Sequence, residues 1–164
     1  MFYKLILAVT TTLSLTAILW ANSIPMAMPD TTPIRYNHEH TRIIAFISQK
    51  NPELIRCIPQ LMKHKRAIEA IAISGIETGF GTKGNALTYN NIGNIKSRRA
   101  DRTWRIYNDM CEGLEDIADL IEREDYADAT IDEMNGHYCV DESRKDNKCE
   151  GWTETIMIFI NEMI

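Results

Sequence analysis

The chain has 164 residues, 45% hydrophobic and 25% charged, so it is long enough for one domain with a buried core and is not of the disordered class. Its formal net charge is −5, and its dense basic clusters are two short runs, residues 63–66 and 96–99, that predict solvated surface. This balance excludes a nucleic-acid-binding protein, which needs a basic stripe to neutralise phosphates.

The first 23 residues have the pattern of a secretory signal peptide. A short positive start at Lys4 precedes an uncharged apolar run, and Ala21 and Ser23 supply the small residues of a signal-peptidase site. The alternative is an uncleaved membrane anchor, although the run is short and rich in Thr for a stable span. We therefore expect an exported protein, periplasmic or secreted, with no membrane contact except through this segment if it stays uncleaved.

A linker and then a single domain are predicted after the signal. Residues 24–40 are rich in Pro and Thr and predict an extended linker, so the domain would span residues 41–164. The alternating His38 and His40 in this linker could bind a metal weakly, but a solvated polar entry to the domain is the preferred interpretation.

The domain is predicted to be mostly helical. The residues from 60 to 77 are apolar almost all round, which is typical of a helix inside a core, and Asn51 and Asp109 are placed as N-caps of their helices. Apolar periodicity, caps and breakers predict helices over these ranges: 41–49, 51 to Pro59, 60–77, 109–125, 126–134 and 152–164.

The centre of the chain has a different pattern. Residues 89–109 carry two groups of β-forming side chains, with a polar turn between them, which predicts a small hairpin. The fold class is therefore α+β and predominantly helical. A cleft between the helical body and the hairpin would suit an extended ligand.

The four cysteines predict two disulfides, because an even count in an exported chain is typical of a disulfide framework. Of the three possible pairings we favour Cys139 with Cys149, which bracket a polar loop, and Cys57 with Cys111. A zinc site is the alternative, but no C-x-x-C spacing is present. The sequence thus predicts no metal and no other cofactor.

Glu77 is the candidate catalytic residue. It ends the most apolar helix, and Gly79 and Gly81 follow it as helix breakers. A carboxyl group among apolar side chains keeps its proton to higher pH, as a general acid must. The alternative is an ordinary helix-end Glu that faces water, although the helix dipole disfavours an anion at that end.

Two motifs around Glu77 resemble the core of glycoside hydrolase family 73, the bacterial cell-wall endo-β-N-acetylglucosaminidases of the flagellar-rod type. Glu77-Thr78-Gly79-Phe80-Gly81 is similar to E-[ST]-G-[WF]-G, and residues 90–96, NNIGNIK, are similar to N-N-x-F-G-x-K. Farther on, TWRIYND, GLEDIADLIERE and Tyr126-Ala127 match an aromatic strand, an acidic helix and a Tyr-Ala pair of the family. The resemblance covers residues 68–127. It implies a lysozyme-like fold, peptidoglycan glycan strands as the substrate, and Glu77 as the catalytic acid.

The sequence departs from this family in two places. Gly93-Asn94 stands where the family has Phe-Gly, and the β-lobe is short. Asp101, the only acid between Lys96 and Tyr107, could be the base that activates water, or it could be a turn residue paired with nearby arginines. The substrate's acetamido group could replace a second acid, or a lytic transglycosylase could use Glu77 alone. A third possibility is a glycan-binding or assembly subunit that kept the fold and lost activity.

Other polar and aromatic residues are weaker candidates for the cleft. Trp104, Tyr107 and Tyr126 could stack on sugar rings or simply pack in the domain. Asn91 could bind an N-acetyl group or brace the backbone, and bracing is the preferred interpretation. We expect the protein to act as a monomer.

Overall fold

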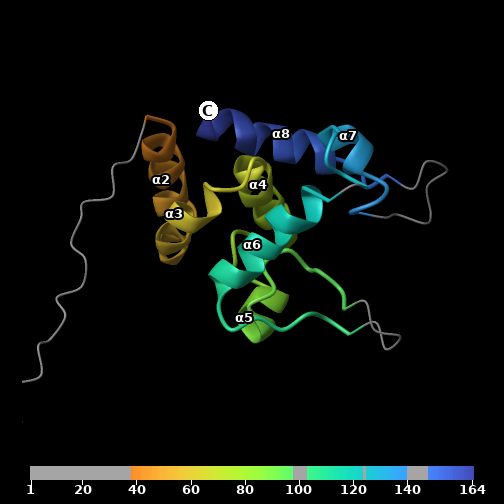
Figure 1. Cartoon of the computed structure of the whole chain (residues 1–164), viewed down its shortest axis with the longest axis horizontal. Coiled ribbons are helices and arrows are strands. Elements are labelled where there is room, and N and C mark those ends of the chain that lie inside the picture. The colour runs from red at the N-terminus through yellow and green to blue at the C-terminus, as the bar shows by residue number, and fades with distance from the viewer. Residues whose placement is uncertain (1–37, 98–102, 124, 140–147) are drawn as a thin grey trace, which may run out of the picture. The chain divides into compact units, whose positions relative to one another are not determined.

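The computed structural model describes residues 38–97, 103–123, 125–139 and 148–164, which belong to a compact unit spanning Arg35–Ile164. The predicted signal peptide and most of the predicted linker lie outside these residues. The described chain is mostly helical, as the sequence predicts (Figure 1). Its helices are α2 (His38–Lys50), the 3₁₀ helix η1 (Pro52–Cys57), α3 (Ile58–Leu61), α4 (Ala67–Thr78), α5 (Asn85–Tyr89), α6 (Met110–Ile121), α7 (Ile131–Met134) and α8 (Trp152–Met163).

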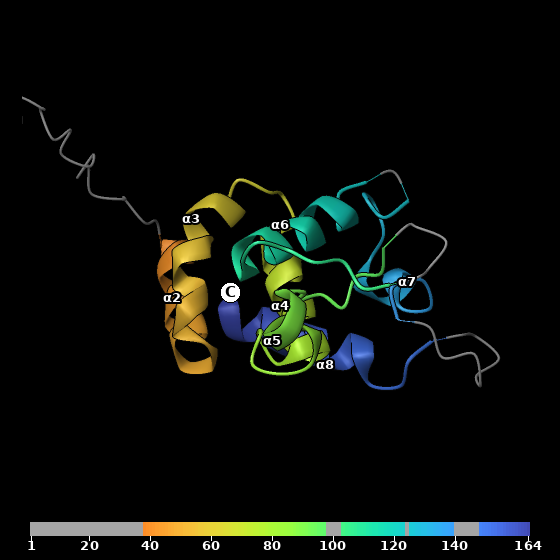
Figure 2. The same cartoon turned by 90° about the horizontal axis from the view of Figure 1, so that it is seen from below.

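Helix α4 is the centre of the core. It packs against both α6 and α8, and both views show it enclosed between them (Figures 1 and 2). Its Ile71 and Ile73 are fully buried, and each contributes about 1.5–3 kcal/mol by leaving water. Gly75 lets the rings of Phe80 and Phe159 pack directly against the backbone of α4. A Cβ there would lie 2.4 Å from the Phe80 ring and 2.8 Å from the Phe159 ring. The all-round apolar character of this helix is thus explained by neighbours on both sides.

The predicted helix over residues 60–77 is interrupted. Helix α3 ends at Leu61, and α4 begins at Ala67 after a turn. The break follows from tertiary hydrogen bonds at Arg66, whose backbone N–H donates to Glu122 Oε1 at 2.9 Å and whose Nη1 donates to the Tyr126 carbonyl at 2.7 Å. These bonds hold the chain at Arg66 against the end of α6, so α3 and α4 do not form one continuous helix.

Helix α2 begins at His38, earlier than the expected domain boundary at residue 41. His38 and His40 therefore belong to its first turn, and the predicted extended linker is wrong for residues 38–40. In the part of the chain that the structure describes, no helix is long and apolar enough to cross a membrane. Nor does any group of three His, Cys, Asp or Glu residues within that part lie close enough to hold a metal ion.

The predicted hairpin has much less regular structure than expected. Within the described residues it amounts to one isolated antiparallel bridge between Lys96 and Trp104. A hydrogen bond from the Arg105 N–H to the Ile95 carbonyl, 3.0 Å long, continues this pairing by one step. The predominantly helical class is confirmed, whereas a β-lobe is absent from the residues that are described.

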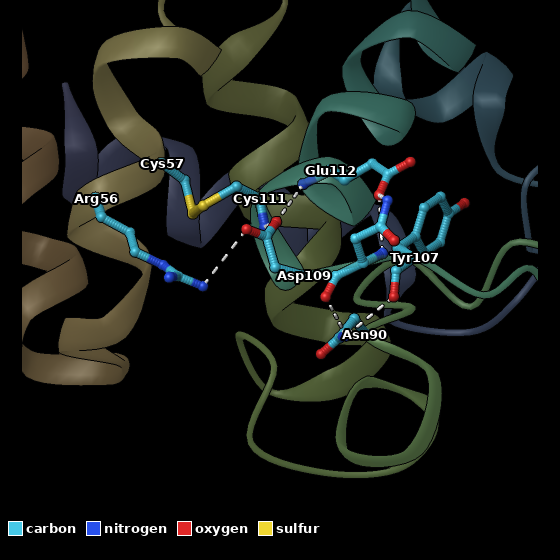
Figure 3. Close-up of polar contacts among 8 residues, drawn as sticks. Arg56, Cys57, Asn90, Tyr107, Asp109, Cys111 and Glu112 are labelled. Atoms are coloured by element: carbon cyan, nitrogen blue, oxygen red, sulfur yellow. Dashed lines mark hydrogen bonds and ion pairs between the residues drawn. A yellow bond between two sulfur atoms is a disulfide. The ribbon is translucent and has the colours of Figure 1, made fainter. Parts of the chain in front are cut away.

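Both predicted disulfides are present. Cys57 at the end of η1 is joined to Cys111 in the first turn of α6, and Cys139 is joined to Cys149 just before α8. Figure 3 shows the first of them beside Asp109, which caps α6 by accepting hydrogen bonds from the backbone N–H groups of Cys111 and Glu112. Two disulfides fit a protein of an oxidising compartment.

Candidate functional site

The first motif forms a rigid end of α4. Gly79 takes the left-handed conformation, with φ of 58°, and its N–H donates to the Gly75 carbonyl at 2.9 Å. Phe80 then turns back into the core, where its ring lies 5.4 Å from that of Phe46 and 5.1 Å from that of Phe159. The motif thereby fixes the last turn of the helix, on which Glu77 stands.

The Glu77 carboxyl group is partly exposed and accepts hydrogen bonds from two neutral donors. Trp152 Nε1 donates to Oε1 at 3.2 Å, and Asn94 Nδ2 donates to Oε2 at 3.0 Å. Asn94 Nδ2 also lies 3.0 Å from the Glu77 carbonyl oxygen. No described residue forms an ion pair with Glu77. The two donors orient the carboxyl group and leave each oxygen a lone pair that can carry a proton.

The second motif is a loop attached to the same helix end. Thr78 Oγ1 donates to the Ile92 carbonyl at 2.7 Å, so adjacent residues of the first motif hold Ile92 and Asn94 of the second. Asn91 is fully buried. Its Nδ2 donates to the carbonyls of Ile95 and Arg105, and its Oδ1 accepts from the Ile95 N–H at 2.8 Å. Asn91 therefore braces the loop, as preferred above, and its assignment as a substrate-binding residue is corrected.

A cleft of about 370 Å³ adjoins the second motif, and Glu77 is connected to it through Asn94 without being one of its lining residues. Asn94 connects the two, because it lines the cleft and donates to the Glu77 carboxylate. The described lining residues, none of which is acidic, are Gly93, Asn94, Ile95, Lys96, Leu120, Tyr126, His137 and Tyr138. The second motif thus forms one wall, and α6 and the turn after α7 supply the others.

Tyr138 is one of the residues that line this cleft. Its hydroxyl donates to the Gly93 carbonyl at 2.9 Å, and its ring lies 5.9 Å from that of Trp152. Burial raises the pKa of Tyr138 well above its ordinary value, and the nearby charge of Glu77 adds to the effect, so this hydroxyl stays a neutral donor. A Cβ on Gly93 would lie 2.5 Å from Ile117 and 2.9 Å from the Tyr138 hydroxyl. The space next to Gly93 is therefore already filled by Ile117 and Tyr138, and a side chain at this position would not fit without a shift of these neighbours.

The predicted aromatic residues divide into two groups. Tyr126 lines the cleft, and Trp104 adjoins it through Lys96, whose Nζ lies 5.6 Å from the Trp104 ring centroid. Tyr107, in contrast, donates its hydroxyl to Asp116 Oδ2 at 2.6 Å and is not among the residues that line the cleft. Burial, with the hydrogen bond to Asp116, raises the pKa of Tyr107 well above its ordinary value. Tyr107 is therefore a structural residue, and its assignment to substrate binding is corrected.

Asp116 is the centre of a second polar cluster that sequence reasoning missed. It accepts hydrogen bonds from Arg105 Nη1 and from Tyr107, and Arg123 Nη2 lies 3.9 Å from its other oxygen. The three partners come from two segments that only folding brings together. This cluster fastens the segment after the Lys96–Trp104 bridge to α6.

One predicted site residue lies outside the described chain, and three residues at Glu77 or its cleft were not predicted as site residues. Asp101, the candidate base, is in the stretch 98–102, which the structure does not describe. Trp152 was expected as a core residue, and its 2% exposure confirms this; its hydrogen bond to Glu77 was not expected. His137 and Tyr138 carried no recognisable motif. No pattern in the sequence predicts the hydrogen bond from the Trp152 indole to Glu77.

A larger, shallow groove of about 540 Å³ lies elsewhere, along α2 and the end of α8. Lys50 and Glu162, which line it, face each other at 3.8 Å and are exposed. Among its described lining residues there is no buried or oriented acid. Glu77 and its cleft therefore remain the better candidate for chemistry.

Comparisons with protein-family models, with curated proteins and with solved structures each find no match to this chain. The resemblance to glycoside hydrolase family 73 therefore rests on the motifs themselves. Hydrogen bonds join those motifs in space: Thr78 contacts Ile92, and Glu77 contacts Asn94.

Proposed function

We propose that this protein is a glycosidase that cleaves the glycan strand of peptidoglycan, an endo-β-N-acetylglucosaminidase with Glu77 as the general acid. One observation carries the proposal: a single carboxyl group, fixed at the end of a buried helix, is held by two neutral N–H donors beside a cleft. Neutral donors orient an acid without neutralising it, which suits a group that must give and take a proton.

In the proposed reaction Glu77 protonates the glycosidic oxygen as the bond from that oxygen to the anomeric carbon breaks. The sugar passes through an oxocarbenium-like transition state, and water adds to the anomeric carbon to give a new reducing end. Asp101 is the sequence candidate for the base that deprotonates the water. In the alternative, the substrate's acetamido oxygen attacks the anomeric carbon as the glycosidic bond breaks and forms a cyclic oxazolinium intermediate. Water then opens this intermediate, and the Glu77 carboxylate accepts the water's proton.

A lytic transglycosylase is the second candidate, because no described residue that lines the cleft is acidic. In that reaction a hydroxyl group of the same sugar attacks the anomeric carbon in place of water. Glu77 first protonates the leaving oxygen and then accepts the proton of the attacking hydroxyl group. The product is an anhydro-sugar end, and no second carboxyl group is required.

We also propose that the protein works outside the cytoplasm and as a monomer. Two disulfides in one small domain support an oxidising compartment. The predicted signal peptide over residues 1–23 gives the route of export, and it is the only segment for which we propose contact with a membrane.

The test is analysis of the products that the full chain releases from purified peptidoglycan. Mass spectrometry distinguishes the candidates, since reducing ends identify hydrolysis and anhydro ends identify transglycosylation. Glu77→Gln should release no fragments, whereas Glu154→Gln, the same change on an exposed turn of α8, should act as the wild type. Sedimentation with peptidoglycan but no release by any variant would replace the proposal with a binding subunit.

A further inference from the structure

The cleft beside Glu77 has a basic lining in an acidic protein. Lys96 and His137 are among its lining residues, although the chain has a formal net charge of −5. Hydroxyl groups of a neutral sugar are bound well by uncharged donors, whereas a cation forms a charge-assisted hydrogen bond with a carboxylate. Building on the proposed function, we propose that Lys96 recognises a carboxylate carried by the glycan, so that the cleft prefers acidic glycans to neutral ones.

Lys96 is held in a defined place for this role. Its backbone is fixed by the bridge to Trp104 and by the hydrogen bond from the Ser97 N–H to the Thr103 carbonyl, 2.6 Å long. Its ammonium group lies over the Trp104 ring, 5.6 Å from the centroid, which limits the positions it can take. The ammonium group is thus positioned by an uncharged aromatic surface.

The positive charge of Lys96 is also available to a ligand. The residue is exposed and forms no ion pair with any described residue. Arg105, which follows Trp104 on the same segment, is instead bound by Asp116. Of these two described cations, Arg105 is neutralised inside the protein and Lys96 lines the cleft.

His137 is another nitrogen-bearing side chain in the lining of the cleft. It is exposed and stands in the turn that the Cys139–Cys149 disulfide holds against the start of α8. A peptidoglycan strand offers a carboxylate from two sources: the lactyl group on the sugar itself and the peptide attached to it. Both have the same chemistry, so the experiment must separate them.

The experiment measures dissociation constants by calorimetry, with Glu77→Gln in every protein so that no probe is cleaved. The three probes are a neutral N-acetylglucosamine tetrasaccharide, a peptide-free peptidoglycan tetrasaccharide with lactyl carboxylates, and the same tetrasaccharide with its peptides. We expect Lys96→Gln to weaken binding of a carboxylated probe about threefold to fivefold and binding of the neutral probe less than twofold. Lys96→Arg should preserve the preference. Lys63→Gln, the same charge change at an exposed lysine bound to Gln60, should have no effect.

The preference should also shrink as salt is added, because exposed charges are screened. A loss confined to the peptide-bearing probe assigns the carboxylate to the peptide, and a loss with both acidic probes assigns it to the sugar. Equal weakening of acidic and neutral probes, or no weakening at all, overturns the inference. If Glu77-dependent cleavage occurs while Lys96→Gln changes nothing, only this inference fails and the proposed function stands.

Discussion

Helices α4 and α6 each carry a partly buried carboxylate, and the two are held in opposite ways. Glu77 on α4 receives hydrogen bonds from an amide and an indole, both uncharged. Asp116 on α6 is surrounded by two guanidinium groups and a phenol. The comparison teaches that two partly buried carboxylates of one domain can differ completely in the charge of their partners. The Asp116 carboxylate is compensated by cations and joins two segments of the fold, whereas the Glu77 carboxylate is oriented by uncharged donors and has no cationic partner among the described residues.

The largest expected effect is on the activity of Glu77→Gln. We expect the rate of peptidoglycan cleavage to fall about a thousandfold, since an amide cannot protonate the leaving oxygen and general acid catalysis is worth roughly 10²–10⁴. The free energy of unfolding should change by only about 1 kcal/mol, because Gln has the same shape and keeps one acceptor. Fragment release and urea unfolding measure the two quantities. A variant that cleaves at the wild-type rate would remove Glu77 from the reaction.

The two disulfides extend the comparison, because Cys57–Cys111 anchors the start of α6 and Cys139–Cys149 anchors a wall of the cleft. Their sequence separations are 54 and 10. Loop-closure entropy then predicts a loss of about 4 kcal/mol when the first is replaced by two serines and about 3 kcal/mol when the second is replaced. Thermal unfolding measures both losses.

Activity should follow the opposite order. Removing Cys139–Cys149 frees the turn that carries His137 and Tyr138, so at temperatures where both variants are folded it should reduce cleavage more than removing Cys57–Cys111. Equal losses of activity in the two variants would show that the second disulfide has no particular connection with the cleft.

Asp116→Asn should reduce stability more than Glu77→Gln does. The Asp116 side chain is 17% exposed. Removal of its charge leaves Arg105 uncompensated in a half-buried position, at a cost of about 2 kcal/mol once solvent screening is allowed for. Tyr107→Phe removes one hydrogen bond of the same cluster and should cost about 1 kcal/mol. Urea unfolding measures both losses. An Asp116→Asn variant as stable as the wild type would contradict the structural role of the cluster.

The smallest expected effect concerns Glu122, a third carboxylate, at the end of α6. Burial acts to raise the pKa of Glu122, but hydrogen bonds from the Arg66 backbone N–H and from His64 outweigh it and lower the pKa below the ordinary value of 4.5. Because the folded-state pKa is lowered, the stabilisation is complete above the ordinary value and is lost as the pH falls through the lowered one.

Melting temperatures between pH 6 and pH 3 should therefore fall less steeply for Glu122→Gln than for the wild type. Glu133 is an unsuitable control, since the Thr130 N–H and hydroxyl also lower its pKa. Glu154→Gln on α8 serves as the control and should leave the slope unchanged. Parallel curves for wild type and Glu122→Gln would contradict a lowered pKa at this residue.

Much of the fold follows from local patterns in the sequence. The Asn51 and Asp109 caps and both disulfide pairs are found as predicted. Capping depends on side chains within one helical turn. The apolar helix before Glu77 is found as a buried helix, with an earlier break that local patterns do not show. That break depends on Glu122 and on the Tyr126 carbonyl, about 60 residues away along the chain.

The sequence by itself determined a helical domain with two disulfides in which one acid ends the core helix. Periodicity and caps depend on neighbouring residues, and an even cysteine count in an exported chain is typical of a disulfide framework. Only the tertiary structure decided how that acid is held. Trp152, 75 positions along the chain, and Asn94 reach its two oxygens, whereas Arg105 and Arg123 pair with Asp116. Such pairings depend on how helices pack, and packing is a property of the whole chain.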